Sequence, residues 1–98
     1  MAELLLEYEA VVAAGRSYGA RAWASAAHDG TTNWHAWIEF MPLNGGPAIC
    51  TDRETTQPNR MCTLYWCTGL TPLYLEGALA RARERAAKPA FNVRHLES

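Results

Sequence analysis

The sequence predicts an α+β fold: a four-stranded antiparallel sheet that carries a C-terminal helix on one face, with a short helix preceding it. Two neighbouring segments, 18–27 and 33–41, alternate in polarity as strands do, and a loop that contains Asp-Gly separates them. A third segment, 70–88, carries helix signals at both of its ends. The 98 residues, 49% of them hydrophobic, suit one domain over residues 1–98, in which residues from about 90 to 98 form a tail.

The first strand is expected at about 5–13, where alternating residues favour a strand although three leucines could also open a helix. A turn at 15–17 leads into the second strand. On one face of that strand the side chains are small or apolar: Tyr18, Ala20, Ala22, Ala24 and Ala26. Arg21, Trp23 and Ser25 lie on its other face, because successive side chains of a strand point to opposite sides.

The loop at 28–32 fixes how the second and third strands pair, and its Asp-Gly is expected to supply the positive φ of a hairpin. In this register Arg21 faces Glu39 and Trp23 faces Trp37, so an opposite-charge pair and an aromatic pair share one surface. On the other surface large side chains oppose alanines. The remaining expected pairs are Ala20 with Phe40, Ala22 with Ile38, Ala26 with Trp34, and Ser25 with His35.

A fourth, peripheral strand is expected at about 48–54, followed by a polar loop over 55–59. The next segment, 58–68, is ambiguous, because its residue types also suit a strand. The spacing of its apolar residues favours a helix that ends at Gly69.

Residues 70–88 give the clearest helix signal in the chain. Thr71 is a good N-cap, Pro72 suits the first helical position, and Pro89 stops the helix. One face is a narrow apolar stripe of Leu75, Ala78, Leu79, Ala82 and Ala86. A second stripe of small residues with one leucine follows Leu73, Gly77, Ala80 and Ala87, and it could receive a second helix, including one from a partner subunit.

Composition excludes several classes of function. A net charge of −1 gives no general attraction to nucleic acid. The chain has neither a leader-like segment nor a long apolar span, so a cytoplasmic protein without a membrane partner is expected. Its three cysteines, Cys50, Cys62 and Cys67, suit free thiols in a reducing compartment. Their spacing is not that of a zinc site, and no metal or other cofactor is expected, although a redox or nucleophilic thiol remains an alternative.

The leading candidate site is the sheet face opposite the C-terminal helix. It would carry Arg21, Trp23, His35, Trp37 and Glu39, with Arg53 beside them. Exposed tryptophan and arginine side chains often mark contact surfaces. Three alternatives remain open: another segment covers the face within the monomer, a second copy of the chain binds it, or a ligand or foreign protein binds it. We therefore expect a small non-enzymatic binding or interaction module that forms a homodimer through this face or through the second helical stripe.

The main alternative is a small enzyme. Its polar pocket would lie around Asp52, Arg53 and Glu54, with His35 and Trp66 nearby. The same region could instead bind a ligand, so Glu54 and Trp66 join the six residues above as predicted binding residues. The sequence contains no serine-nucleophile motif, phosphate-binding glycine loop or HExxH motif, and no catalytic residue is assigned.

Two short segments resemble HicB-type antitoxin domains. Phe40-Met41-Pro42-Leu43-Asn44-Gly45 is similar to the aromatic-Pro-x-x-x-Gly turn of that family, and Tyr74-Leu75-Glu76-Gly77-Ala78-Leu79 is similar to its helix. The order of three strands followed by a helix is also similar. Residues 51–68 have no counterpart in that pattern, and no DNA-binding tail follows the helix. The resemblance implies a toxin as the protein partner.

Overall fold

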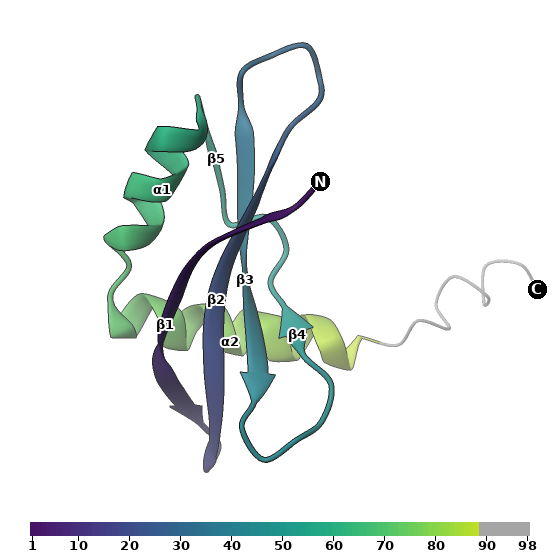
Figure 1. Cartoon of the computed structure of the whole chain (residues 1–98). Helices are drawn as coiled ribbons and strands as arrows, with labels where there is room; N and C mark the ends of the chain where they lie inside the picture. The colour runs from purple at the N-terminus through teal and green to yellow at the C-terminus, as the bar shows by residue number, and fades with distance from the viewer. Residues whose placement is uncertain (89–98) are drawn as a thin grey trace, which may run out of the picture.

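The computed structural model describes residues 1–88 and shows an α+β fold (Figure 1). Its elements, in chain order, are β1 (Glu3–Ala13), β2 (Arg16–Ala26), β3 (Trp34–Pro42), β4 (Ile49–Cys50), β5 (Thr55–Gln57), α1 (Arg60–Thr68) and α2 (Pro72–Ala87). The sheet is antiparallel and has the order β1-β2-β3-β4, with β5 also paired to β3. The predicted fold class is confirmed, while the predicted tail beyond residue 89 lies outside the described residues.

The pairing of β2 with β3 follows the expected register throughout. Arg21 pairs with Glu39, Trp23 with Trp37, and Ser25 with His35. The pairs on the opposite surface are also confirmed, namely Ala20 with Phe40, Ala22 with Ile38, and Ala26 with Trp34. The two indoles therefore lie on the side of the sheet that carries Arg21 and Glu39.

β1 pairs with β2 less regularly than strict alternation predicts. The register shifts once between Leu4 and Leu6 and again between Tyr8 and Val11, as it does at β-bulges. Because of these shifts Val11 is buried, whereas Val12 is exposed. Strict alternation would put Tyr8 and Val12 on one face, and the register shift between Tyr8 and Val11 breaks that pattern.

The two hairpin loops obtain positive φ from different residues. Between β1 and β2, Ala14 (φ 53°) and Gly15 (φ 74°) are both left-handed, as the two central residues of a type I′ turn must be. In the 28–32 loop, His28 and Gly30 have positive φ, but Asp29 does not. Asp29 instead accepts hydrogen bonds from the backbone and hydroxyl of Thr31, so the Asp-Gly pair does not form a tight two-residue turn.

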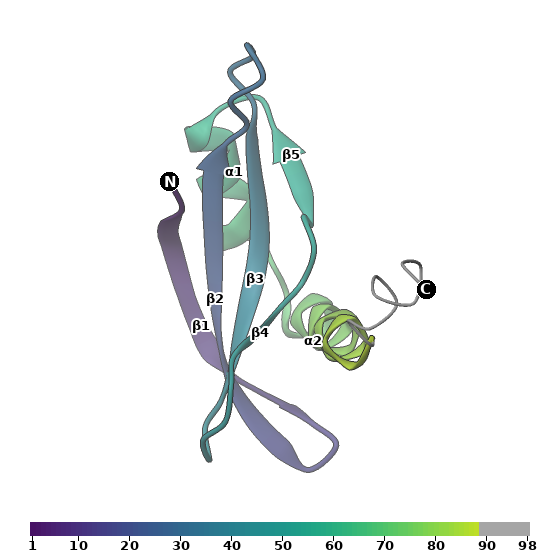
Figure 2. The ribbon, with the colours of Figure 1, turned by 90° about the vertical axis from the view of Figure 1, so that its right-hand side faces the viewer.

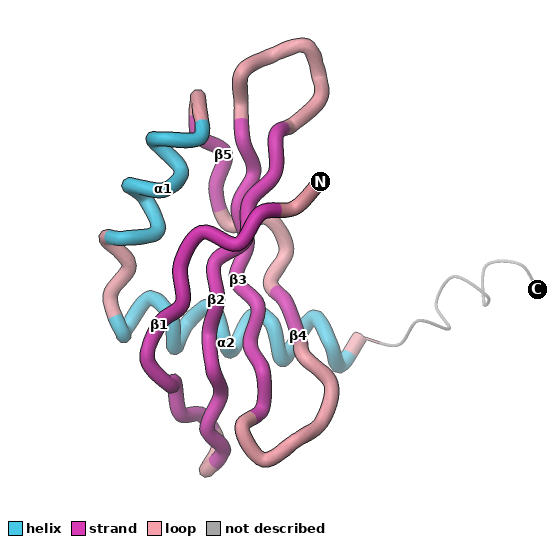
Figure 3. The backbone as a smooth tube through the Cα atoms, in the orientation of Figure 1, coloured by secondary structure: helices cyan, strands magenta, loops and turns pink. Residues whose placement is uncertain are grey.

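Of the fourth strand expected at 48–54, only the short β4 forms, and an irregular segment separates it from β5 (Figure 3). Both β4 and β5 pair with β3, and β5 falls where a polar loop was predicted. Between them the buried Thr51 hydroxyl accepts a hydrogen bond from the backbone N–H of Ile38 at 3.0 Å. The Thr51 N–H donates to the carbonyl of Ile38 at 2.9 Å, so Thr51 forms hydrogen bonds with both the N–H and the carbonyl of Ile38.

Both helices begin at the expected kind of cap. The Asn59 side chain accepts from the N–H of Cys62 at the start of α1, and the Thr71 side chain accepts from the N–H of Tyr74 at the start of α2. α1 ends at Gly69, which confirms a helix here, although Gly69 has φ −93° and does not use the left-handed conformation. On α2 the expected apolar stripe is buried except for Ala86, which is exposed.

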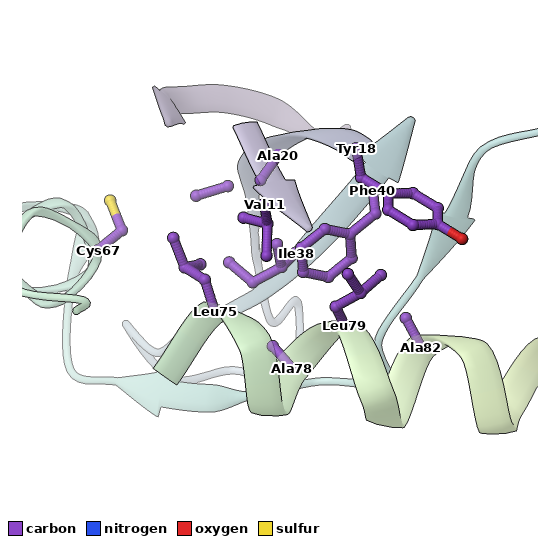
Figure 4. Close-up of a cluster of buried hydrophobic side chains, with 11 residues drawn as sticks. Val11, Tyr18, Ala20, Ile38, Phe40, Cys67, Leu75, Ala78, Leu79 and Ala82 are labelled. Atoms are coloured by element: carbon purple, nitrogen blue, oxygen red, sulfur yellow. The ribbon is translucent and has the colours of Figure 1, made fainter. Parts of the chain in front are cut away.

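The hydrophobic core lies between the sheet and the two helices (Figure 4). Ile38 and Phe40 are fully buried and point from β3 toward Leu75 and Leu79 of α2. Ala20 and Ala22 of β2 and Ala78 and Ala82 of α2 complete this layer. Because these residues are small, α2 lies close to the sheet.

Candidate binding face

One side of the sheet carries both helices, and the opposite side carries the predicted contact residues. Figure 2 shows α2 on one side of the strands, and Cys67 places α1 in the same core. Within residues 1–88, no helix lies over the other side. We call it the outer face, and register and side-chain contacts assign to it Leu4, Glu7, Arg21, Trp23, Ser25, His35, Trp37, Glu39 and Arg53.

The centre of the outer face is a fixed arrangement of one carboxylate, one guanidinium and one indole. Glu39 accepts a hydrogen bond from Trp23 Nε1 at 2.9 Å and lies 3.2 Å from Arg21 Nε. The Arg21 guanidinium lies over the Trp23 ring, 5.9 Å from its centroid. Arg21 and Glu39 are largely buried by their neighbours, with side chains 30% and 19% exposed. These contacts hold Trp23 in one orientation, so the surface is ordered before anything binds to it.

A second group of polar side chains lies at the β5 end of the same face. His35 Nδ1 is 3.0 Å from Thr56 Oγ1 and 3.4 Å from Arg53 Nη1. Since arginine can only donate, Nδ1 is the acceptor, and a neutral imidazole then carries its proton on Nε2. A hollow of about 520 Å³ opens here, lined by Ser25, His35, Trp37, Asp52 and Arg53. Six of the eight predicted binding residues thus lie on one continuous surface.

The other two predicted binding residues, Glu54 and Trp66, lie elsewhere. Glu54 accepts a hydrogen bond from the Tyr74 hydroxyl at 2.6 Å and forms an ion pair with Arg81 of α2. Trp66 of α1 packs edge-on against Tyr74, with the ring centroids 6.1 Å apart. Tyr74 therefore joins these two residues on the helix side, away from His35 and Arg53. This separation argues against the polar pocket that the enzyme alternative requires.

Asp52 is likewise turned away from a shared catalytic centre. Its carboxylate lies 3.0 Å from Arg85 Nε of α2, although the residue also borders the hollow beside Arg53. The side chains of adjacent residues in this irregular segment thus lie on opposite sides of the sheet: Arg53 contacts His35, and Glu54 contacts α2. Sequence spacing alone could not separate them, because the segment leaves regular strand geometry at Thr51.

The Tyr74–Glu54 contact makes a testable prediction about stability at high pH. Burial, together with the hydrogen bond to Glu54, raises the pKa of Tyr74 to about 12 from an ordinary value of 10.0. A group whose pKa is raised on folding stabilises the protein fully below its unfolded pKa, and that stabilisation is lost as pH rises through the folded pKa. The free energy of unfolding should therefore fall between pH 10 and about 12.

Urea denaturation across this pH range tests the effect, with Tyr74→Phe as the control. The stability difference between wild type and Tyr74→Phe should shrink as pH rises, because the variant lacks the ionising hydroxyl. A difference that stays constant up to pH 12 would contradict the assignment. Tyr8 contributes in the same direction in both proteins, because burial also raises its pKa, so the comparison removes its effect.

The three thiols occupy different surroundings. Cys67 is buried and its Sγ donates to the Leu64 carbonyl, while Cys50 lies across from Glu39 at the β4 edge. Burial first, and the Glu39 carboxylate second, raise the pKa of Cys50. A raised pKa lowers the thiolate fraction and so disfavours nucleophilic or redox chemistry at this residue. Among the described residues, no group of three or more His, Cys, Asp or Glu side chains is placed to hold a metal ion.

Several residues of the face were not predicted from the sequence. Leu4 pairs with Trp23 and Glu7 pairs with Arg21, so both extend the outer face onto β1. The register shift after Leu4 hides this, because strict alternation would put Leu4 and Leu6 on the same side. The opposite charges of Glu7 and Arg21 could have indicated this pairing from the sequence, because an opposite-charge pair is favourable across neighbouring strands.

Comparisons of the chain with protein-family models, with curated proteins and with solved structures find no match. The similarity to HicB-type antitoxin domains stays a prediction. In the described part of the chain, no helix has both the length and the apolar character needed to cross a membrane.

Proposed function

We propose that this protein is a small non-enzymatic binding module whose outer face binds a second copy of the chain. The observation that carries the proposal is the position of two partly buried indoles, Trp23 and Trp37, side by side in register on the sheet face that neither helix covers. Tryptophan and arginine are the residue types most enriched among side chains that dominate binding energy at interfaces. An aromatic patch of this kind on an uncovered sheet face is typical of a contact surface.

The charges of the outer face support a second copy of the chain as the partner. The face carries both signs: Arg21 and Arg53 are basic, while Glu7, Glu39 and Asp52 are acidic. A surface with mixed signs can pair its basic groups with the acidic groups of a second copy about a two-fold axis, whereas a surface of one sign cannot. The central aromatic pair then lies near the axis of the dimer and the charged side chains surround it.

The ordering of the face favours binding. Trp23 is held by its hydrogen bond to Glu39 and by the guanidinium of Arg21 over its ring. Side chains that are already ordered lose less conformational entropy when a partner arrives, so more of the contact energy is retained. A standard interface buries about 800 Å² on each partner, which is an area that one face of a small sheet can supply.

Sedimentation equilibrium of matched variants tests this proposal. We expect the wild type to have twice the monomer mass of 10.9 kDa, and Trp37→Lys to sediment as a monomer with an unchanged far-ultraviolet circular dichroism spectrum. Loss of a central aromatic anchor reduces the favourable free energy of dimerisation by about 2 kcal/mol or more, which weakens the dimer roughly thirtyfold. An unpaired lysine buried in the interface would weaken it further. The control is Leu73→Lys, which places the same charge on an exposed leucine of α2.

The control also tests the second helical stripe, to which Leu73 belongs. If Leu73→Lys abolishes the dimer and Trp37→Lys does not, the helix surface is the interface and the assignment to the outer face is wrong. A wild type that stays monomeric at the highest concentration would refute self-association altogether.

A further inference from the structure

We propose that the hollow at the β5 end of the outer face is a binding site for a small organic anion, in which a carboxylate or phosphate group is attached to a flat ring. The hollow is bounded by Ser25, His35, Trp37, Asp52 and Arg53. It is an open depression of about 520 Å³ rather than an enclosed cavity. This inference rests on the proposed function of the outer face as a binding surface. It uses only the part of Trp37 that borders the hollow, at the margin of the face, and it does not require the second copy.

Arg53 provides the charge that an anion needs. Its neighbour Asp52 forms an ion pair with Arg85, 3.0 Å away on α2. Within residues 1–88, no carboxylate lies within ion-pair distance of the Arg53 guanidinium, which is exposed in the hollow. A guanidinium presents parallel N–H groups that match the two oxygens of a carboxylate or phosphate. The one acidic side chain that lines the hollow is thus paired with a cation, and the basic one has no carboxylate partner among the described residues.

The other polar groups at the hollow add donors. His35 Nδ1 accepts from Arg53, so the proton of the neutral ring is on Nε2, the nitrogen that remains available to a ligand. Ser25 is the cross-strand partner of His35 and brings a hydroxyl that can also donate. A guanidinium, an imidazole N–H and a hydroxyl together favour an anion over a cation.

Trp37 accounts for the ring that we assign to the ligand. It borders the hollow and is only partly buried, so part of its indole is accessible beside Arg53. A flat ring can stack against an accessible indole of this kind. A ligand that combines an oxyanion with a flat ring would contact Arg53 through the oxyanion and Trp37 through the ring.

Binding of phenyl phosphate and benzoate to the full chain, followed by NMR chemical shifts and calorimetry, tests the site. We expect dissociation constants of about 1 mM or tighter, with shifts at the His35 ring and the Trp37 indole. Inorganic phosphate should bind more weakly than phenyl phosphate, and neutral benzyl alcohol should not compete. Whichever of phenyl phosphate and benzoate binds more tightly identifies the preferred oxyanion.

Two arginine variants give the decisive comparison. Arg53→Ala should weaken binding at least about tenfold, and Arg53→Lys should restore part of it, because lysine keeps the charge but lacks the paired donors. Arg83→Ala removes an exposed arginine from α2 and should leave the affinity unchanged. Equal affinity in wild type and Arg53→Ala, or no binding of either probe to the wild type, overturns the proposal.

Sedimentation of the same variants separates this inference from the proposed dimer. Arg53 lies at the margin of the outer face, so Arg53→Ala should remain a dimer while losing the anion. A monomeric wild type that binds the probes through Arg53 would refute the dimer and keep the anion site. A wild-type dimer that binds neither probe would support the proposed dimer and refute the anion site.

Discussion

Replacing Phe40 with alanine should lower the free energy of unfolding by about 3–5 kcal/mol, the usual cost of removing a fully buried aromatic side chain. Phe40 is 0% exposed and lies between β2 and α2, where Ala20 faces it across the strands and Leu79 meets it from the helix. Its buried neighbours include Tyr18, Ile38 and Leu79, which are held in place by the sheet and by α2 and can only partly fill the space. Part of the cavity therefore stays open, which adds to the cost of losing the side chain.

Urea denaturation followed by circular dichroism measures this loss, and Leu43→Ala is the matched control. Leu43 lies three residues after Phe40, directly beyond the end of β3, and is 62% exposed, so its truncation should change the stability by less than about 0.5 kcal/mol. Similar costs for the two variants would mean that Phe40 is not the centre of the core. Such a result would also question the register that puts Trp37 on the opposite surface.

The pairing of β2 with β3 could be predicted because two independent constraints agree. The loop at 28–32 sets the separation of the strands, and the alternation of alanines with large residues selects one face for the core. The pairing of Arg21 with Glu39 then follows without further assumption. This is why five residues of the candidate face could be assigned to one surface from the sequence: Arg21, Trp23, His35, Trp37 and Glu39.

Residues 48–57 could not be predicted in the same way. Polar and apolar residues do not alternate along this segment. It pairs with β3 once through β4 and again through β5, and between these two strands it moves away from β3. The position of Glu54 on the helix side depends on this break, and so does the position of Arg53 beside His35. Which side of the sheet a side chain takes is decided here by the irregular segment between β4 and β5, and the local residue types do not indicate where that segment begins.

Thr51 is the residue that makes this break possible. Where the edge segment leaves β3, the N–H of Ile38 would have no partner, because Ile38 is fully buried and water cannot reach it. The Thr51 hydroxyl takes the place of the missing backbone carbonyl at 3.0 Å. The hydroxyl is therefore part of the sheet's hydrogen bonding, and the segment after it is free to turn Arg53 outward and Glu54 toward α2.

Replacing Thr51 with valine should accordingly destabilise the fold by about 1–3 kcal/mol, since the shape is kept and a buried N–H loses its acceptor. Thr51→Ser keeps the hydroxyl and loses one methyl group, so its cost should be closer to 1 kcal/mol. Thermal or urea unfolding ranks the two variants, and amide hydrogen exchange at Ile38 reports the bond itself. Exchange at Ile38 should accelerate in Thr51→Val more than the global loss of stability explains, while exchange in Thr51→Ser should not. If valine and serine cost the same and leave Ile38 equally protected, the hydroxyl does not hold the edge segment, and the placement of Arg53 beside His35 needs another cause.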